Sequence, residues 1–120
     1  MHNYQELKIW QKGMDLATET YQITQKFPAE EKFGLISQMR RCAVSIPSNI
    51  AEGAAFDSDN QFLHFLSISN GSCNELLTQS IIAQRIGFLT EDEQKLFSGK
   101  ITEIQKMNFT LRNNLKKKQK

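Results

Sequence analysis

The densest group of chemically useful side chains surrounds a proline near the middle of the chain, in the stretch SIPSNIAEG, residues 45–53. Hydroxyl, amide and carboxyl groups there can form hydrogen bonds with the backbone or with a partner; they are Ser45, Ser48, Asn49 and Glu52. Arg40 and Arg41 precede the stretch and suit either an anionic partner or a carboxylate such as Glu75. We therefore expect a polar packing or binding site centred on Pro47.

The side chains that most often carry out catalysis are too scattered to form a recognisable site. His2 and His64 lie far apart in the sequence, and His64 sits among phenylalanines. The patterns HExxH and GxSxG, a glycine-rich phosphate loop and the Glu-x-x-His pair of di-iron bundles do not occur. We expect a protein that is not an enzyme, with no catalytic residue, metal or cofactor. Cys42 and Cys73 lack CxxC spacing and are expected to be buried, reduced thiols.

The elements that must position these side chains are helices, because apolar residues recur every three or four positions. The N-terminal segment has two apolar stripes, so we expect this helix to be covered on more than one side. The first stripe is Leu7, Trp10, Met14, Ala17 and Tyr21, and the second is Ile9, Leu16 and Ile23. The helix should end by Phe27, since Pro28 disfavours helical geometry in the residue before it.

A second helical period starts near Leu35 and continues through Pro47. Pro28 suits the first turn of this element, although Gly34 weakens that turn. Gly53 is expected to end it. The period predicts one helix that is kinked at Pro47 rather than two helices divided there.

Two further helices follow. Ser58 is a candidate N-cap for the third, which is apolar on more than one face and ends at Gly87. Thr90 and Glu93 form a capping box for the fourth, whose seam carries one polar residue, Asn108. The apolar residues of that seam are Phe97, Ile101, Ile104, Leu111 and Leu115. Four helices with short connections predict an all-α, antiparallel up-down four-helix bundle.

A proline inside a helix cannot donate to the carbonyl four residues earlier, which here belongs to Ala43. If the second and third helices are antiparallel about a turn near residue 57, Ala43 faces Asn70 and Ser72, and Pro47 faces Ser67. We expect these hydroxyl and amide groups to compensate for the missing donor.

The same counting places Arg40 and Arg41 opposite Glu75 and predicts a partly buried arginine–Glu75 ion pair. Two interpretations of this polar belt stay open. It fixes the register of the helices, or it borders a kinked groove that binds a partner.

Net charge is +2 but is unevenly distributed. From Lys106 onward there are six basic residues and no acidic ones, which leaves nine basic and thirteen acidic residues in the rest of the chain. The domain expected is residues 1–115, with a basic C-terminal tail at 116–120. Such a tail can reach phosphates, or it can simply solvate the helix end. No apolar run resembles a signal peptide or membrane span, so we expect a cytoplasmic protein.

The stretch RRCAVSIPSNIAEG, residues 40–53, resembles a bacterial family, the 23S ribosomal RNA intervening-sequence proteins. The resemblance covers nearly the whole chain; its other segments are LKIWQKGMDLA (7–17), FPAEEKFGL (27–35), QMRR (38–41), FLHFLSISNGSCNEL (62–76) and IAQRIGFL (82–89). It implies an up-down bundle, often a ring-like homopentamer, with no established catalytic activity. Accessory proteins of diversity-generating retroelements look like relatives, which implies RNA or DNA and a reverse transcriptase or other protein as candidate partners.

By this resemblance, two sets of residues are singled out. The structural signature is Ser45, Pro47, Asn49, Glu52, Gly71, Ser72 and Glu75. The candidate nucleic-acid-binding residues are Arg40, Arg41, Arg112, Lys116, Lys117, Lys118 and Lys120. The chain departs from the family pattern after AEG, where Phe56 replaces a common arginine and Asp57 and Asp59 follow, and at Leu77 and Ser80 of ELLTQS.

We therefore expect a non-catalytic homo-oligomer associated with nucleic acid. The alternatives are a purely protein–protein module and, as the weakest, an enzyme with an unrecognised site near Arg40, Asn49, Glu52 and Glu75.

Overall fold

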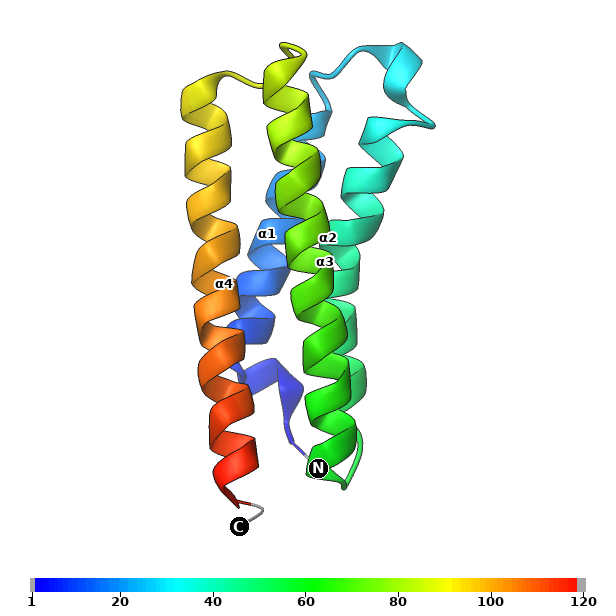
Figure 1. Ribbon diagram of the computed structural model, residues 1–120. Coiled ribbons are helices and arrows are strands. Elements are labelled where there is room, and N and C mark those ends of the chain that lie inside the picture. The colour runs from blue at the N-terminus through cyan, green and yellow to red at the C-terminus, as the bar shows by residue number, and fades with distance from the viewer. Residues whose placement is uncertain (1, 119–120) are drawn as a thin grey trace.

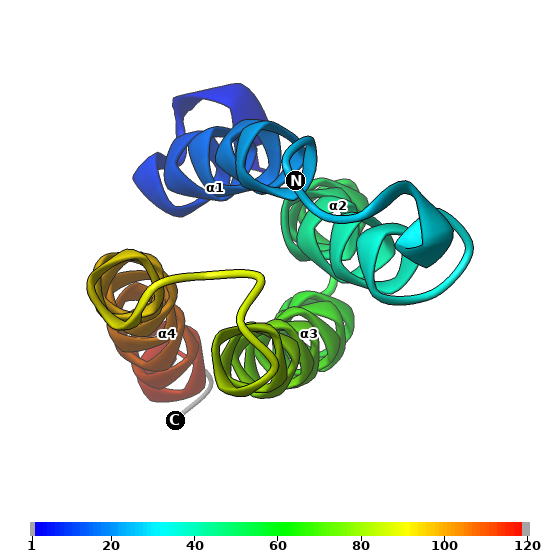
Figure 2. The same ribbon diagram turned by 90° about the horizontal axis from the view of Figure 1, so that it is seen from above.

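The computed structural model describes residues 2–118, which form four helices in antiparallel sequence (Figure 1). The helices are α1 (Lys8–Thr24), α2 (Leu35–Ala54), α3 (Asp59–Arg85) and α4 (Glu91–Lys118), with short 3₁₀ turns η1 (Tyr4–Glu6) and η2 (Ala29–Glu31). Viewed along the bundle, they follow one another around it in chain order (Figure 2). The expected all-α four-helix bundle is confirmed, and the described part of the chain contains no strand.

The helix ends follow the local chemistry of the sequence. The hydroxyl of Ser58 accepts a hydrogen bond from the amide of Gln61, which confirms it as the N-cap of α3. Thr90 and Glu93 form the predicted reciprocal capping box, with bonds of 2.8 and 3.1 Å. Gly87 adopts a φ of 88°, a conformation that glycine reaches without strain, and so ends α3.

The start of α2 differs from the simplest expectation. The turn after Pro28 is the separate 3₁₀ turn η2, and Gly34 interrupts the helical backbone with φ −106° and ψ −115°. A carboxylate oxygen of Glu31 then accepts the amide hydrogen of Leu35, which supplies a partner for a free helix-start donor. At its other end α2 runs to Ala54, one residue beyond Gly53.

The core lies on the inner faces of all four helices. Its largest fully buried side chains are Phe62, Phe97, Leu16, Met39, Ile46, Ile50, Leu66, Leu76, Ile101, Ile104, Leu115 and the polar Asn108. The amide of Asn108 donates to the carbonyl of Leu66 at 2.9 Å, so this polar residue links α4 to α3. Burying its hydrogen-bonded amide favours one register of the two helices.

The two stripes of α1 have different surroundings. Ile9 and Leu16 of the second stripe are buried in the core. Met14 and Tyr21 of the first stripe stay exposed on the side of α1 that borders α2. The other helices of the bundle therefore leave the first, longer apolar stripe of α1 partly exposed.

None of the helices within residues 2–118 combines the length and the apolarity needed to cross a membrane.

Candidate functional site

Pro47 lies inside an unbroken α2, as the period of the sequence predicts. Its ring packs against α1, because a Cβ added to the buried Gly13 would lie 3.3 Å from the Cβ of Pro47. The expectation that Pro47 faces Ser67 is wrong: Ser67 is exposed on α3. Counting residues from the turn gives the height of a residue along the helix axis. It does not give the direction in which the side chain points around that axis.

The hydrogen bonds near Pro47 reach carbonyls other than that of Ala43, which was the carbonyl expected to be compensated. The buried hydroxyl of Ser69 donates to the carbonyl of Ile46 at 3.0 Å, and the amide of Asn49 donates to the carbonyl of Ser45 at 2.8 Å. No hydrogen bond from Asn70 or Ser72 to Ala43 is found among the described residues. Asn70 instead accepts from Gln105 of α4 at 3.3 Å.

Ser69 is the functional contact that sequence reasoning missed. It continues the buried series Phe62, Leu66 and Cys73 at steps of three and four residues, which placed it on the core face of α3. A serine on a buried face needs a partner for its hydroxyl, and the facing backbone of α2 supplies one in the carbonyl of Ile46. That pattern was the available signal.

Polar side chains join α2 to α3 along their outer junction, which we call the α2–α3 seam. It consists of Cys42, Ser45, Asn49, Ser72 and Glu75. The hydroxyls of Ser45 and Ser72 lie 2.8 Å apart, and the amide of Asn49 donates to the Ser45 hydroxyl at 2.9 Å. The thiol of Cys42 donates to a carboxylate oxygen of Glu75 at 3.0 Å. Ser45, Asn49, Ser72 and Glu75 of the structural signature thus contribute to one hydrogen-bonded seam.

The predicted arginine–Glu75 ion pair is wrong. Within residues 2–118, no ion pair joins Glu75 to Arg40 or Arg41. Arg40 turns toward α1, where its Nε donates to the hydroxyl of Thr24 at 2.9 Å and its guanidinium lies 4.5 Å from the centre of the Tyr21 ring. An aromatic ring and a hydroxyl on α1 therefore hold the guanidinium that was predicted to pair with Glu75 of α3.

Both thiols are shielded, as expected from the sequence. Burial, together with the hydrogen bond to Glu75 and the charge of that residue, raises the pKa of Cys42 to about 12. Burial alone raises the pKa of Cys73 to about 12. Because the thiolate is the reactive form, neither cysteine is a nucleophile at neutral pH.

The glycines Gly53 and Gly71 have different surroundings. A Cβ on Gly53 would lie 2.7 Å from the Cβ of Phe65, so this glycine lets α2 approach α3 closely. Gly71, by contrast, is exposed, and a Cβ there would meet nothing within 4 Å. Glu52 is exposed too, and its side chain forms no hydrogen bond or ion pair with the described part of the chain. Contacts among residues 2–118 explain Gly13 and Gly53 but give no reason for Gly71 or Glu52.

The candidate anion-binding residues fall in two separate places. Arg40 and Arg41 lie on the half of α2 that follows η2, whereas the lysines occupy the opposite end of the bundle, on the last turn of α4 (Figure 1). Lys116, Lys117 and Lys118 are exposed there, and Lys120 lies outside the described residues. Arg112 is partly buried, and its Nε has no hydrogen-bond partner.

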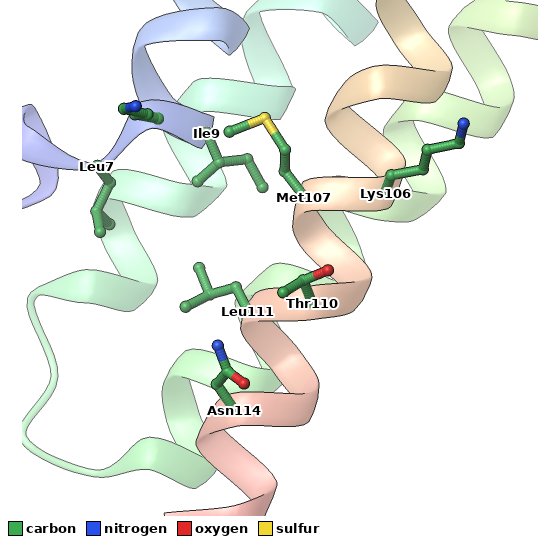
Figure 3. Close-up of a pocket in the computed structure, with 8 residues that line it drawn as sticks. Leu7, Ile9, Lys106, Met107, Thr110, Leu111 and Asn114 are labelled. Carbon is green, nitrogen blue, oxygen red and sulfur yellow. The ribbon is translucent and has the colours of Figure 1, made fainter.

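Two apolar depressions accompany α1. The α1–α2 groove lies along Pro47 and has a volume of about 580 Å³; Trp10, Met14, Tyr21 and Val44 line it. The α1–α4 cleft, of about 390 Å³, lies at the basic end (Figure 3). There Leu7 and Ile9 face Met107 and Leu111 of α4. In residues 2–118 no group of three or more His, Cys, Asp and Glu side chains is placed to hold a metal ion.

The fold and the seam define a small antiparallel four-helix-bundle protein whose second helix continues through a proline and is hydrogen-bonded to α3. The family model of the 23S rRNA-intervening sequence protein matches residues 5–110, so the chain belongs to that family.

A crystal structure of a protein with unknown function from the S23 ribosomal protein family of Bacteroides thetaiotaomicron is similar to this chain. Its sequence is 21% identical, and the match covers 87% of this chain and 97% of that chain with a TM-score of 0.78. This likeness concerns the fold. No curated protein matches the chain.

Proposed function

We propose that the protein is a non-catalytic bundle that assembles with copies of itself in the cytoplasm and presents a basic helix end to RNA or DNA. The support is a single arrangement: an uncovered apolar stripe along α3, with a cluster of lysines at the end of the neighbouring helix. The stripe would join the subunits, and the lysines would bind phosphates.

The outer α3 stripe consists of Ile68, Gly71, Ile82 and Ile86, which recur at helical spacing on one side of α3; Glu75 of the α2–α3 seam lies between them. Ile82 is 46% exposed and Ile86 is 55% exposed. A glycine inside a helix costs about 1 kcal/mol relative to alanine, and Gly71 has no neighbour in its own chain that requires it. If a helix of a second subunit packs against α3, the small side of Gly71 would let the two helices approach closely, which would account for a glycine at this position.

The second component is the basic end of α4. Lys116, Lys117 and Lys118 are exposed side by side on its last turn, and none of them forms an ion pair with another described residue. Exposed lysines without acidic neighbours bind phosphates through charge alone and release counterions. In a ring of subunits, several such ends would lie together and act in concert.

Self-assembly is tested by light scattering on the double variant Ile68→Glu, Ile82→Glu. We expect the wild-type protein to be an oligomer at micromolar concentration and the variant to be a monomer, because each subunit contact would then bury two unpaired charges. Leu96→Glu is the matched control, since it places the same charge at an exposed apolar position on α4, outside the stripe. A monomeric wild-type protein would contradict this part of the proposal.

Nucleic-acid binding is tested by fluorescence anisotropy with labelled single-stranded RNA and DNA oligonucleotides over a range of salt concentrations. We expect Lys117→Glu to weaken binding of every sequence alike and to lower the slope of log affinity against log salt by about 1. Lys95→Glu, on the first part of the same helix, is the control. Salt-independent binding, or none, would reject the nucleic-acid role.

A purely protein–protein module is the alternative that the α1–α2 groove favours, since it leaves an apolar face uncovered on a different side of the bundle. Co-purification of a protein partner after nuclease treatment, with no oligonucleotide binding, would support that alternative.

A further inference from the structure

The α1–α2 groove extends beyond Pro47. A second hollow of about 450 Å³ continues from it, since both are lined by Tyr21 and Val44. The first part is lined by apolar, aromatic and hydroxyl side chains and carries no charge. The second ends at Phe33, whose side chain is 87% exposed. Exposed aromatic and aliphatic residues that adjoin one another along a concave surface typically mark a binding site.

The spacing of the groove residues fits a helix as the occupant. On α1 the stripe consists of Trp10, Met14 and Tyr21, and on α2 a stripe of Arg40, Val44 and Ala51 has the same steps of four and seven. Two neighbouring helices with such stripes offer the ridges and hollows into which a third helix packs. A peptide bound as a β-strand is a poor fit, because that mode of binding needs a sheet edge with free backbone groups.

The charges at one end fit an acidic partner. Lys32, Arg40 and Arg41 line the second hollow, and none of the residues lining either hollow is acidic. Arg40 is held in place, because its guanidinium stacks on Tyr21 and donates to Thr24 and to the carbonyl of Tyr21. Its charge has no carboxylate partner in the described part of the chain. A cation that is fixed in advance and unpaired strengthens and orients binding of an anionic group.

We propose that the α1–α2 groove binds an amphipathic helix of another protein, with its apolar face on Trp10, Met14 and Val44 and its acidic end beside Arg40 and Arg41. The stretch of α1 from Trp10 to Tyr21 is about 16 Å long, which matches roughly three turns of the partner helix. This site goes beyond the proposed function, because it uses neither the outer α3 stripe nor the lysines of α4.

Trp10 makes the site directly measurable, since it is the single tryptophan of the sequence and lines the groove. The probe is a designed, tryptophan-free amphipathic peptide of about 18 residues, with leucines at heptad spacing and glutamates at one end. We expect a saturable blue shift of Trp10 emission as the peptide covers the indole. A peptide with the same leucines and lysines in place of the glutamates should bind about tenfold more weakly.

Variants place the peptide on the groove. Val44→Glu puts a charge in its middle and should weaken binding about a hundredfold, and Arg41→Glu should weaken the acidic peptide about tenfold. Both side chains are exposed, so circular dichroism should show an intact bundle. Met14→Glu repeats the test from α1 if Val44→Glu fails to fold. Leu96→Glu is the control and should bind like the wild-type protein.

Three results would overturn the proposal. Equal affinity for the acidic and basic peptides would remove the role of the arginines. Undiminished binding by folded Val44→Glu or Met14→Glu would place the peptide elsewhere. A shift of Trp10 emission on raising the protein concentration alone, or on adding an oligonucleotide, without competition from the peptide, would assign the groove to a second copy or to nucleic acid. The light-scattering result for the α3 stripe does not affect any of these outcomes.

Discussion

The α2–α3 and α1–α4 contacts hold the bundle together by opposite means. Between α2 and α3, Gly53 permits close approach, and buried Ser69 bonds the backbone beside Pro47. Between α1 and α4, two ion pairs bridge the helices, Lys12–Glu103 and Glu19–Lys100, and Lys26, two residues beyond the end of α1, pairs with Glu93 of α4. Lys12, Glu19 and Lys26 are spaced by seven residues, and toward the start of α1 the junction opens into the α1–α4 cleft.

This difference shows where the stability of the fold is concentrated. Buried hydrogen bonds that leave a group unsatisfied when broken cost about 1–3 kcal/mol, whereas exposed ion pairs contribute about 0–1 kcal/mol. We expect α2 and α3 to form the firm half of the bundle, while α1 and α4 keep register with weaker, salt-sensitive contacts. The firm half also carries the outer α3 stripe and fixes its orientation.

The largest effect should follow from crowding the α2–α3 contact. Gly53→Leu forces a side chain against Phe65, and we expect a loss of about 3 kcal/mol in the free energy of unfolding, measured by urea denaturation. Gly99→Leu is the control, because a Cβ there meets nothing within 4 Å and leucine favours the helix. Equal stability of the two variants would mean that the helices do not depend on this close approach.

Removing the hydroxyl of Ser69 should have the next largest effect. Ser69→Ala takes away the donor to the carbonyl of Ile46, and we expect a loss of about 2 kcal/mol. Ser67→Ala is the matched control, since that hydroxyl is exposed on the same helix. A neutral Ser69→Ala would contradict the account of how α2 and α3 are joined.

These two predictions rest on contacts that the sequence indicates to different degrees. Local patterns within one helix predict the helices themselves, the capping box at Thr90 and the polar residue Asn108 on the apolar face of α4. The structure confirms all three. Local patterns cannot give the rotation of one helix against another. Counting from a turn gave the approximate level of Pro47 in α2 but predicted that its ring faces α3, whereas the close approach of Gly13 shows that it packs against α1.

The arginines illustrate the same limit. Opposite charge favoured Glu75 as the partner of Arg40, but a long side chain reaches either neighbouring helix. The ring of Tyr21 and the hydroxyl of Thr24 together hold the Arg40 side chain against α1. Glu75 accepts a thiol instead. Most residues of the α2–α3 seam were therefore singled out from the sequence, whereas Ser69 and the hydrogen-bond partners were not.

Alkaline pH should weaken the firm half through its buried thiols. Burial raises the pKa of Cys73 to about 12 from an ordinary 9.0, so the folded state retains the proton more strongly than the unfolded chain. The resulting stability is complete below pH 9 and is lost as pH rises toward 12. Urea denaturation at pH 8 and pH 10 should show a larger loss for the wild-type protein than for Cys73→Ala. Identical losses would show that the thiol does not contribute.

The smallest effect should come from the α1–α4 ion pairs. Lys12→Met removes the partner of Glu103 in a pair whose side chains are about half exposed, and we expect a loss of about 0.5 kcal/mol that vanishes at high salt. Lys95→Met, which removes an exposed pair within α4, is the control. A loss comparable to that of Ser69→Ala, or one that persists at high salt, would erase the contrast between the two contacts.

Native-state hydrogen exchange followed with increasing denaturant tests the contrast most directly. The account predicts that backbone amides of residues 48–50 in α2 and 69–73 in α3 exchange only through global unfolding, while those of residues 107–112 in α4 exchange through a smaller, local opening. The opposite order, with the amides beside Pro47 opening locally and the α4 amides protected to the global limit, would contradict it.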